Sequence, residues 1–336
     1  MVETARKEIS VIVPCFNEEG NIRACLESLL DDFTKEKCEV IVVDGISTDG
    51  TRRIVEEFQE KYENIVMLSN PERLQAHALN IGIQHSRGRI IVRIDAHSVY
   101  PKDYVERCVQ LLEEASAENV GGVMAPIGKT PFEEAVAIAM GHPLGIRSAR
   151  GHGTNFRGYV DTVYLGTFRR DVFTKVGYFD PQAHPNEDGE MNLRIQSAGG
   201  KIFMDGSLEV GYGPRGSLRA LARQYYRYGR GRAYTTLKHK KITAYRQVSP
   251  VLLVLGIGIS FGMAPFFKYS LVFPGIYLVS VLAVSLLIRG VKDVRVRCLF
   301  PLVFMTMHLS YGVGFIVRVL TEMVGPRTLR RSEAWP

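Results

Sequence analysis

Cysteine is scarce in this chain of 336 residues, and its thiols show no pairing pattern. The five cysteines are Cys15, Cys25, Cys38, Cys108 and Cys298, and none of them forms a C-x-x-C pair. A disulfide framework and a thiolate zinc site are therefore not expected, and we predict buried free thiols in a reducing compartment. No G-x-G-x-x-G follows the first apolar run, which disfavours a dinucleotide-dependent oxidoreductase. Residues 1–8 are polar and the first apolar run is about five residues long, so no secretory signal is expected there.

Acidic residues are absent from one stretch of the chain and dominate another. Residues 1–214 hold 23 basic and 32 acidic residues, whereas residues 215–248 hold 10 basic residues and no acidic one. Residues 249–336 hold 9 basic and 3 acidic residues, so the overall charge of +7 hides three different segments. We predict a soluble domain over 1–214, a basic amphipathic interfacial segment over 215–248, membrane segments over 249–325 and a basic tail over 326–336.

Short apolar runs alternate with helical patterns in the first part of the chain. The sequences ISVIVP, EVIVVD and RIIVRID, ending near Pro14, Asp44 and Asp95, predict buried strands separated by amphipathic helices. This alternation predicts an α/β fold with a mostly parallel sheet, in which ligands bind at the carboxyl ends of the strands. Between the first two runs we expect a helix over 17–30. Further along the chain we expect a strand over 120–126, a loop over 141–160, helical or loop–helical segments over 167–179 and 187–198, a β segment over 201–212 and a helix over 217–234.

The last third of the chain carries three apolar segments, at about 250–267, 269–288 and 298–317. A bilayer core needs about 20 apolar residues per helix, so we expect transmembrane segments. The basic residues on either side of the first two segments predict a hairpin with its tip near Lys268 and a cytoplasmic catalytic domain. Arg327, Arg330 and Arg331 follow the third segment and would also be cytoplasmic. The third segment is therefore either re-entrant or interfacial, or it departs from this tendency.

Four polar clusters follow the apolar runs. The first two are residues 14–18 (PCFNE), and Asp44 with the turn at residues 47–51 (STDGT). An acid at a strand end suits hydrogen bonds to a nucleotide's base or ribose. The alternative is helix capping by Asn17 and Asp49, because both residue types are preferred caps.

The other two clusters are rich in carboxylates. Asp95 and His97 lie on one side of an extended segment and offer an oxygen and a nitrogen ligand, which suit Mn²⁺ or Mg²⁺ beside a diphosphate. Residues 186–190 (NEDGE) place three carboxylates in four positions, a pattern typical of general-base sites. The alternative for this last cluster is a solvated helix N-terminus, which favours negative charge.

In this order, the motifs resemble those of the family-2 glycosyltransferases over roughly residues 8–235. The matching sequences are VIVPCFNE, VIVVDGISTDGT, RIDAH, GTFRRDVF, NEDGEMNLRI and QYYRY. The resemblance is to membrane-anchored members that build bacterial and archaeal surface polysaccharides, including the succinoglycan-biosynthesis type. It implies a GT-A fold, a nucleotide-sugar donor, a divalent metal (Mn²⁺ or Mg²⁺), and transfer with inversion at the anomeric carbon.

The resemblance also implies roles for individual residues. Asp188 matches the catalytic base, with Glu187 beside it, and Asp95 and His97 match the metal-binding motif. The positions that match donor-binding ones are Pro14, Asn17, Glu18, Asp44, Asp95, Gln224 and Arg227. Arg169, Arg170, Glu187 and Tyr228 are candidates for contacts with the acceptor or a phosphate.

Several positions depart from the family's patterns. Gly45 and Ile46 depart from a common D-D-G-S pattern, so its second acid is missing, and His97 replaces the second acid of the metal motif. Tyr228 replaces the Trp of a Q-x-x-R-W motif found in polymerising members, which puts processive synthesis in doubt. Expected partners are a UDP-sugar or other nucleotide-sugar, a lipid-linked or glycan acceptor, and the membrane.

Several alternatives remain open from the sequence. An enzyme of the same fold that makes a polyprenyl-phosphate sugar would need little help from a general base. A non-catalytic membrane scaffold would not need Asp44, Asp95, Asp188 and the pair Gln224 and Arg227 together. The Arg- and Tyr-rich residues 219–234 would also suit single-stranded nucleic acid, but no nucleic-acid motif accompanies them. Since they precede an apolar tail, we favour lipid headgroups and expect no nucleic-acid partner.

Overall fold

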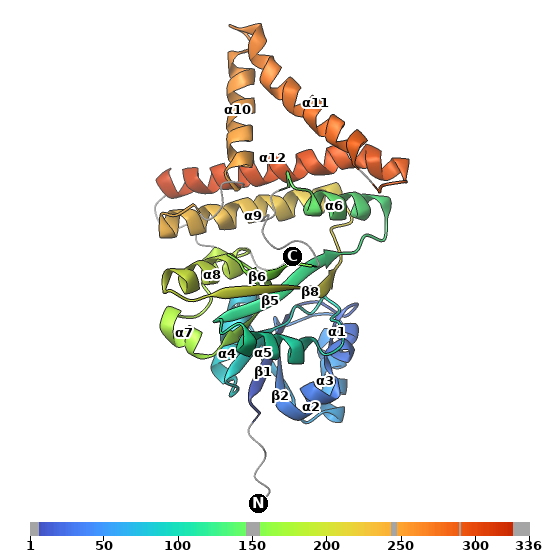
Figure 1. Cartoon of the computed structure of the whole chain (residues 1–336), viewed down its shortest axis with the longest axis vertical. Helices are drawn as coiled ribbons and strands as arrows, with labels where there is room; N and C mark the ends of the chain where they lie inside the picture. Colours follow the sequence, from blue (N-terminus) through green and yellow to red (C-terminus); the bar gives the residue numbers. More distant parts are fainter. Residues whose placement is uncertain (1–6, 146–154, 243–246, 289, 325–336) are drawn as a thin grey trace, which may run out of the picture. The chain divides into compact units, whose positions relative to one another are not determined.

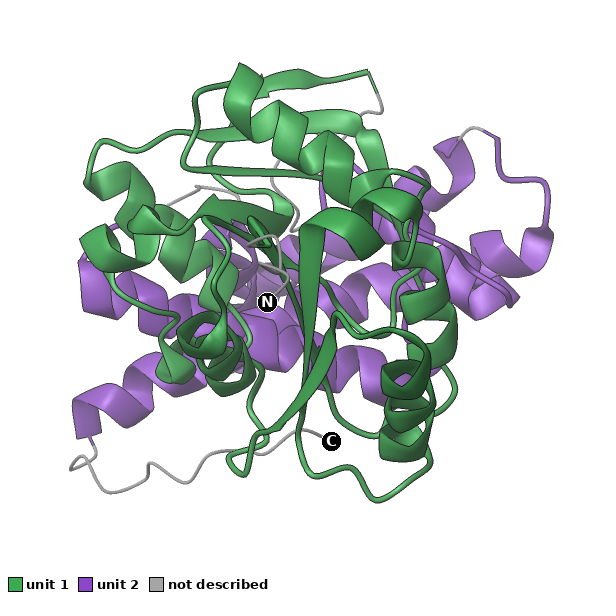
Figure 2. Cartoon of the chain, turned by 90° about the horizontal axis from the view of Figure 1, so that it is seen from below, with its two compact units in different colours: residues 1–125, 150–212, 331–336 green, residues 126–149, 213–330 purple. Residues whose placement is uncertain are grey.

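The computed structural model describes residues 7–145, 155–242, 247–288 and 290–324, and the chain divides into two compact units. The described residues of the first unit come from 1–125 and 150–212, and those of the second from 126–149 and 213–330 (Figure 2). The chain therefore leaves the first unit after residue 125, returns to it, and leaves again after Tyr212.

The first unit is built on one eight-stranded sheet with the order β3-β2-β1-β4-β7-β5-β8-β6 (Figure 1). Strands β1 (Ile9–Cys15), β2 (Cys38–Asp44), β3 (Ile65–Ser69) and β4 (Ile90–Arg93) pair in parallel, as the apolar runs predict. Strand β7 (Tyr164–Arg169) is antiparallel to both β4 and β5 (Asn119–Pro126), and β6 (Arg157–Tyr159) is antiparallel to β8 (Ile202–Tyr212). The α/β prediction is confirmed, and the sheet is mixed, because its second half is antiparallel where described.

Helices pack on both faces of this sheet. The helices of the first unit are α1 (Ile22–Leu29), α2 (Asp32–Lys37), α3 (Thr51–Lys61), α4 (Gln75–His85), α5 (Tyr104–Glu114), α7 (Asp171–Val176) and α8 (Glu187–Ser197), with a short 3₁₀ turn at Pro181–Ala183. Successive side chains of β1 point alternately into two apolar cores, one on each face of the sheet. Val11 and Val13 pack in the same core as Leu26 of α1, whereas Ile12 packs in the core that contains Leu79 of α4.

Two predicted elements differ from the observed ones. The helix expected over 17–30 begins only at Ile22, because Asn17 adopts a left-handed backbone conformation with φ of 54°. The helical or loop–helical segment expected over 167–179 starts as the end of strand β7, and only Asp171–Val176 is helical. Residues 146–154 of the loop expected over 141–160 lie outside the described residues.

The second unit is helical. Its helices are α6 (Pro131–Gly141), α9 (Leu218–His239), α10 (Ser249–Met263), α11 (Val272–Leu287) and α12 (Val294–Val324), with a 3₁₀ turn at Lys268–Leu271. Within this unit α9 and α12 run side by side, α6 packs on α12, and α10 and α11 form a hairpin (Figure 1). Its core joins Val136 of α6, Leu221 of α9, and Phe300 and Phe304 of α12.

Glycines let the backbones of α9 and α12 approach closely. A Cβ atom at Gly229 would lie 2.0 Å from the carbonyl oxygen of Tyr311, and one at Gly314 would lie 2.1 Å from that of Tyr226. Both distances are far below van der Waals contact. Any side chain at either position would therefore push the two helices apart.

The three predicted membrane segments correspond to α10, α11 and α12. Within the described residues, two helical stretches are long and apolar enough to cross a membrane, Lys268–Leu287 and Val294–Val324. Helix α10 has 15 residues, which corresponds to about 22 Å, less than the ~30 Å of a bilayer's hydrocarbon core. The most apolar part of α12 is 44% buried, against 11% for the other stretch, so α12 is also a packed element of its unit.

Candidate active site

Asp95 lies just after strand β4, and its position is tightly defined. Its backbone N–H donates to the Tyr100 hydroxyl at 2.7 Å, and that hydroxyl donates to the Asp95 carbonyl at 3.2 Å. Its Oδ1 accepts hydrogen bonds from Gln75 Nε2 at 2.8 Å and from Nε and Nη2 of Arg93 at 3.3 and 3.2 Å. One carboxylate oxygen is thus oriented by two side chains from two different elements.

Arg93 brings the end of β4 together with the start of α8. Besides Asp95, its Nη1 donates to Oδ1 of Asp188, and its Nη2 lies 3.8 Å from Oε1 of Glu187. The side chains of Arg93 and Glu187 are buried, whereas that of Asp188 is 30% exposed. The site therefore holds three carboxylates around one guanidinium, and Asp188 is the carboxylate most open to solvent.

This arrangement separates the pKa values of the two neighbouring acids of α8. Burial, together with the negative charges of Glu187 and Asp95, raises the pKa of Asp188 to about 7, although Arg93 opposes the shift. For Glu187, burial also favours the neutral form, but His184 and Arg93 outweigh it and hold its pKa below the usual range. His184 Nδ1 lies 3.7 Å from Oε2 of Glu187. One acid thus stays ionised, while the other exchanges a proton near neutral pH.

His97 lies on the turn that follows Asp95. Its Nδ1 is 3.5 Å from Oε1 of Glu18, and its side chain is partly exposed. Among the described residues, no three His, Cys, Asp or Glu side chains converge to hold a metal ion. A carboxylate and an imidazole nevertheless fit a Mn²⁺ or Mg²⁺ ion whose other ligands come from a diphosphate and water, the usual arrangement in phosphate-binding sites.

Asp44, at the end of β2, is fully buried and already bonded within the chain. Its Oδ1 accepts from the Ser47 hydroxyl at 2.5 Å, and its Oδ2 accepts from the Ser47 N–H at 3.1 Å and from Arg52 Nη1 at 2.9 Å. The Arg52 side chain is 39% exposed. A ligand at this strand end would therefore meet Arg52 before it met the carboxylate.

The predicted residues of the loop that follows β1 are hydrogen-bonded to residues at and just before the start of α3. Asn17 Oδ1 accepts from the N–H of Thr48 at 2.9 Å, and the Ser47 hydroxyl accepts from the Asn17 N–H at 2.9 Å. The Glu18 N–H donates to the Thr51 hydroxyl at 2.7 Å. Pro14 lies within β1, beside Val43 of β2. Asn17 thus links two loops by hydrogen bonds. It does not cap α1, because the N-cap residue of that helix is Asn21, which makes no side-chain capping hydrogen bond.

Arg169 and Arg170 bind the carboxyl-terminal ends of neighbouring helices. Arg169 Nη2 donates to the Leu112 carbonyl at 3.1 Å and to Glu113 at 3.0 Å, at the end of α5. Arg170 Nη1 donates to the Ile83 carbonyl at 3.3 Å, at the end of α4. These contacts are structural, and a role in phosphate binding stays a prediction.

The motif residues Gln224, Arg227 and Tyr228 lie on α9, in the second unit. Gln224 Nε2 donates to the Tyr228 hydroxyl at 3.1 Å, one helical turn away. Their parts in donor or acceptor binding stay predictions. The basic tail over 326–336 lies outside the described residues.

Sequence reasoning missed the residue that joins the site, Arg93. A signal was available, because Arg93 stands in an otherwise apolar strand and is two residues from Asp95, hence on the same side of the chain. Tyr100 and His184 carried no comparable signal, because their partners depend on tertiary contacts.

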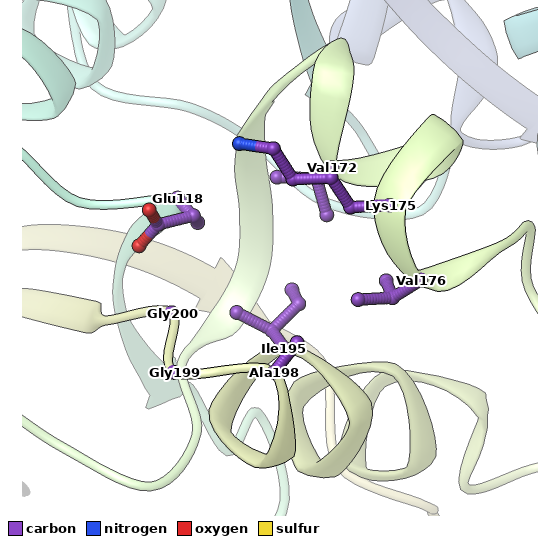
Figure 3. A pocket seen from close by; sticks show the side chains of 8 residues that line it. All are labelled: Glu118, Val172, Lys175, Val176, Ile195, Ala198, Gly199 and Gly200. Carbon is purple, nitrogen blue, oxygen red and sulfur yellow. The ribbon is translucent and has the colours of Figure 1, made fainter.

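A separate pocket of about 190 Å³ lies at the carboxyl-terminal end of α8 (Figure 3). Its walls include Glu118, Lys175 and Ile195, and none of the residues of the candidate active site lines it.

Known proteins share sequence and fold with this chain. A model of the family described as Glycosyl transferase family 2 matches residues 10–177. The succinoglycan biosynthesis protein ExoA of Rhizobium meliloti (strain 1021) is 32% identical over 310 residues, which cover 91% of this chain and 93% of that protein. The chain belongs to glycosyl transferase family 2. The predicted resemblance is confirmed, and this family member is a glycosyltransferase of polysaccharide or glycan biosynthesis.

Other relatives and solved structures extend the comparison. A dolichyl N-acetyl-alpha-D-glucosaminyl phosphate 3-beta-D-2,3-diacetamido-2,3-dideoxy-beta-D-glucuronosyltransferase of Methanococcus voltae is 29% identical over 66% of this chain and 71% of that protein. The mannosyltransferase PcManGT from Pyrobaculum calidifontis, in complex with GDP-Man and Mn²⁺, has a TM-score of 0.59 and 21% identity, covering 95% of this chain and 88% of that one. S. aureus TarS 1-349 in complex with UDP-GlcNAc has a TM-score of 0.51 and 18% identity, covering 91% and 92%. This family-2 member has the GT-A fold.

Proposed function

We propose that this protein is a metal-dependent inverting glycosyltransferase that moves a sugar from a nucleotide-sugar, in our expectation a UDP-sugar, to a lipid-linked or glycan acceptor. The observation that carries the proposal is the place of Asp188, which is the most exposed of three carboxylates around Arg93. Its carboxylate is partly exposed, and its pKa of about 7 suits a general base at neutral pH. The preceding carboxylate, Glu187, is buried, and its pKa is held below the usual range.

In this proposal Asp188 takes the proton of an acceptor hydroxyl. The oxygen attacks the anomeric carbon from the face opposite the nucleotide, so the new glycosidic bond forms as the bond to the diphosphate breaks. The configuration at that carbon is therefore inverted. Arg227, which resembles the arginine of the family's motif on α9, is proposed to bind the departing diphosphate.

The nucleotide is proposed to bind at the loops that follow β1 and β2. Asn17 and Glu18 shape the first loop, and Asp44 holds Arg52 and Ser47 in the second. Since the Asp44 carboxylate is already bonded, we propose that it acts on the donor through these two side chains. The nucleotide-sugars in the solved structures of PcManGT and TarS support a donor of this class.

Asp95 and His97 are proposed to hold a divalent ion. When bound, Mn²⁺ or Mg²⁺ supplies positive charge against the negative charge that develops on the leaving diphosphate. The surrounding acidic residues make such a charge necessary for binding an anionic donor. The Mn²⁺ in the PcManGT complex supports a divalent ion in an enzyme of this fold, and the choice of Asp95 and His97 as its ligands is part of the proposal.

We also propose that the protein is attached to the cell membrane, with its catalytic unit on the cytoplasmic side. The hairpin of α10 and α11 carries many exposed apolar side chains, among them Ile259, Phe266 and Val279, which are 66%, 86% and 65% exposed. Helix α9 adds exposed basic residues, Arg219, Arg223 and Lys238, that complement anionic lipid headgroups. These two features support a lipid bilayer as the partner of the second unit.

A donor screen tests the enzymatic proposal. The full chain in detergent, with lipid extract and MnCl₂, is offered UDP- and GDP-sugars; release of the nucleotide is measured, and the product is identified by mass. Asp188→Asn should lower transfer by about 10²–10⁴-fold, the range for loss of a general base, without weakening UDP binding. The matched control is Asp171→Asn, a surface acid paired with Lys175, which should behave like the unmodified protein.

Two outcomes of this screen would contradict the proposal. Transfer that survives Asp188→Asn, with a polyprenyl-phosphate sugar as product, would favour a phosphate nucleophile. Failure to release nucleotide from every donor would favour a scaffold.

Labelling tests the membrane proposal. Cys298 is an exposed thiol and is first replaced by Ser. A Ser270→Cys probe in the hairpin turn should then resist a membrane-impermeant maleimide applied from the cytoplasmic side of inverted vesicles. Full labelling at the rate seen in detergent would show that the hairpin is not inserted.

A further inference from the structure

Arg93 is a charged residue in the middle of a sheet. It lies on β4, between β1 and β7, and its neighbours Ile91 and Val92 belong to the two apolar cores. A buried guanidinium is costly unless ionic and hydrogen-bonding partners surround it. The partners of Arg93 come from two elements that serve different parts of the proposed reaction.

On the donor side, Arg93 binds Asp95. Nε and Nη2 both donate to the same oxygen, at 3.3 and 3.2 Å, and Gln75 donates to that oxygen as well. On the acceptor side, Nη1 donates to Oδ1 of Asp188, the proposed base. One rigid, planar group therefore links the carboxylate proposed to hold the donor's metal with the carboxylate proposed to activate the acceptor.

We propose that Arg93 is a positioning residue that sets the place of Asp188 relative to the donor. This inference rests on the proposed function. The planar fork of Arg93 fixes two directions at once, toward Asp95 and toward Asp188. Lysine has the same charge but is a single flexible point donor that does not reproduce this geometry.

The acids at the start of α8 explain why such a link is needed. Glu187 and Asp188 are adjacent, and both face a site that already contains Asp95. Without Arg93, mutual repulsion would favour a rotation of Asp188 toward solvent, away from the place where an acceptor hydroxyl must meet the sugar. A displacement of about 1 Å at such a group is enough to cost on the order of 100-fold in rate.

The test compares Arg93→Lys with a matched control, Arg194→Lys. Arg194 also donates to a carboxylate of α8, that of Glu190, and to the carbonyls of Gly177 and Tyr178. None of its described hydrogen bonds goes to Asp95 or Asp188. For Arg93→Lys we expect kcat to fall on the order of 100-fold, with the dissociation constant for UDP and MnCl₂ changed by less than about threefold. Arg194→Lys should lower the Tm and leave kcat near that of the unmodified protein.

Hydrogen exchange gives a readout that does not depend on activity. In Arg93→Lys, the amides of residues 190–193, the first in α8 with helical acceptors, should lose protection while the strands of the first unit keep theirs. If Arg93→Lys does not fold, Asp95→Ala serves instead. It removes the donor-side anchor of Arg93, and it should loosen the same amides although residue 95 belongs to another element.

Three results would overturn the proposal. The first is a kcat for Arg93→Lys close to that of the unmodified protein. The second is a loss of protection spread over the whole first unit, which would indicate a merely structural role. The third is unchanged exchange at 190–193 in both variants. If the unmodified protein transfers no sugar, the proposed function fails, and the exchange results still decide whether Arg93 positions α8.

Discussion

Arg93 Nη1 donates a hydrogen bond to Oδ1 of Asp188, although 95 residues separate the two in sequence. A single side chain thereby joins strand β4 to the first turn of α8. Because Arg93 also binds Asp95, the three residues form one continuous network across two elements.

The first prediction concerns pH. Burial and neighbouring negative charge raise the pKa of Asp188 to about 7. A base acts only when deprotonated, so activity should fall as the pH drops below 7 and level off above it. The measurement is kcat/KM for the donor and acceptor found in the screen, between pH 5 and 9. A profile that stays flat down to pH 5 would contradict the assignment of Asp188 as base.

The second prediction concerns the metal. His97→Ala should weaken Mn²⁺ binding in the presence of UDP by at least about tenfold, a typical loss when a metal site is disturbed. Electron paramagnetic resonance of free and bound Mn²⁺ measures this directly. His85→Ala is the control, because His85 contacts only the Ile81 carbonyl of its own helix among its described hydrogen bonds. Equal Mn²⁺ affinity in both variants would contradict a metal-binding role for His97.

The third prediction concerns Asp44. Asp44→Ala leaves Arg52 Nη1 and both donors of Ser47 without their buried acceptor, so the free energy of unfolding should fall by about 1–3 kcal/mol. Urea unfolding followed by intrinsic fluorescence measures the change. Asp32→Ala, whose side chain is 99% exposed, is the control and should be close to neutral. Normal stability combined with lost donor binding would instead mean that Asp44 contacts the nucleotide directly.

The fourth prediction concerns the second unit. A methyl group at Gly314 would meet the Tyr226 carbonyl at 2.1 Å, so Gly314→Ala should force α9 and α12 apart and cost about 1–3 kcal/mol. Thermal unfolding in detergent micelles measures the loss. At Gly258 of α10 nothing lies within 4 Å of a new Cβ, and Gly258→Ala should be neutral or slightly stabilising. Similar effects at both positions would argue against the close packing of α9 and α12.

Local pattern was enough to predict the parallel half of the sheet. The runs ending at Pro14, Asp44 and Asp95 are short, apolar and bounded by turn residues. They correspond to strands β1, β2 and β4. Strand β7 was not predicted because it pairs with β4 and β5, which are distant in sequence, and because the helix at 171–176 follows it directly. Its state is decided by tertiary pairing, which a local window does not contain.

The acidic residues of the site could be predicted from the sequence, but the arginine that joins them, Arg93, could not. Asp95, Glu187 and Asp188 stand in motifs that the sequence displays. Their link through Arg93 requires the fold, because β4 and α8 meet only in three dimensions. The bonding of Asp44 to Arg52 was hidden for the same reason, and the part of Asp44 in donor binding stays a prediction.

The path of the chain between the two units has a practical consequence for anyone who wants a soluble catalytic fragment. The sequence suggests cutting at 214, yet α6 precedes that point and belongs to the helical unit. Its side chains Val136 and Ala139 share a core with Leu221 and Phe300, which such a cut would remove. A chain ending at 214 would expose this apolar face to water and should aggregate. A better fragment would also replace residues 126–149 with a short polar linker between β5 and the part of the chain that returns to the sheet.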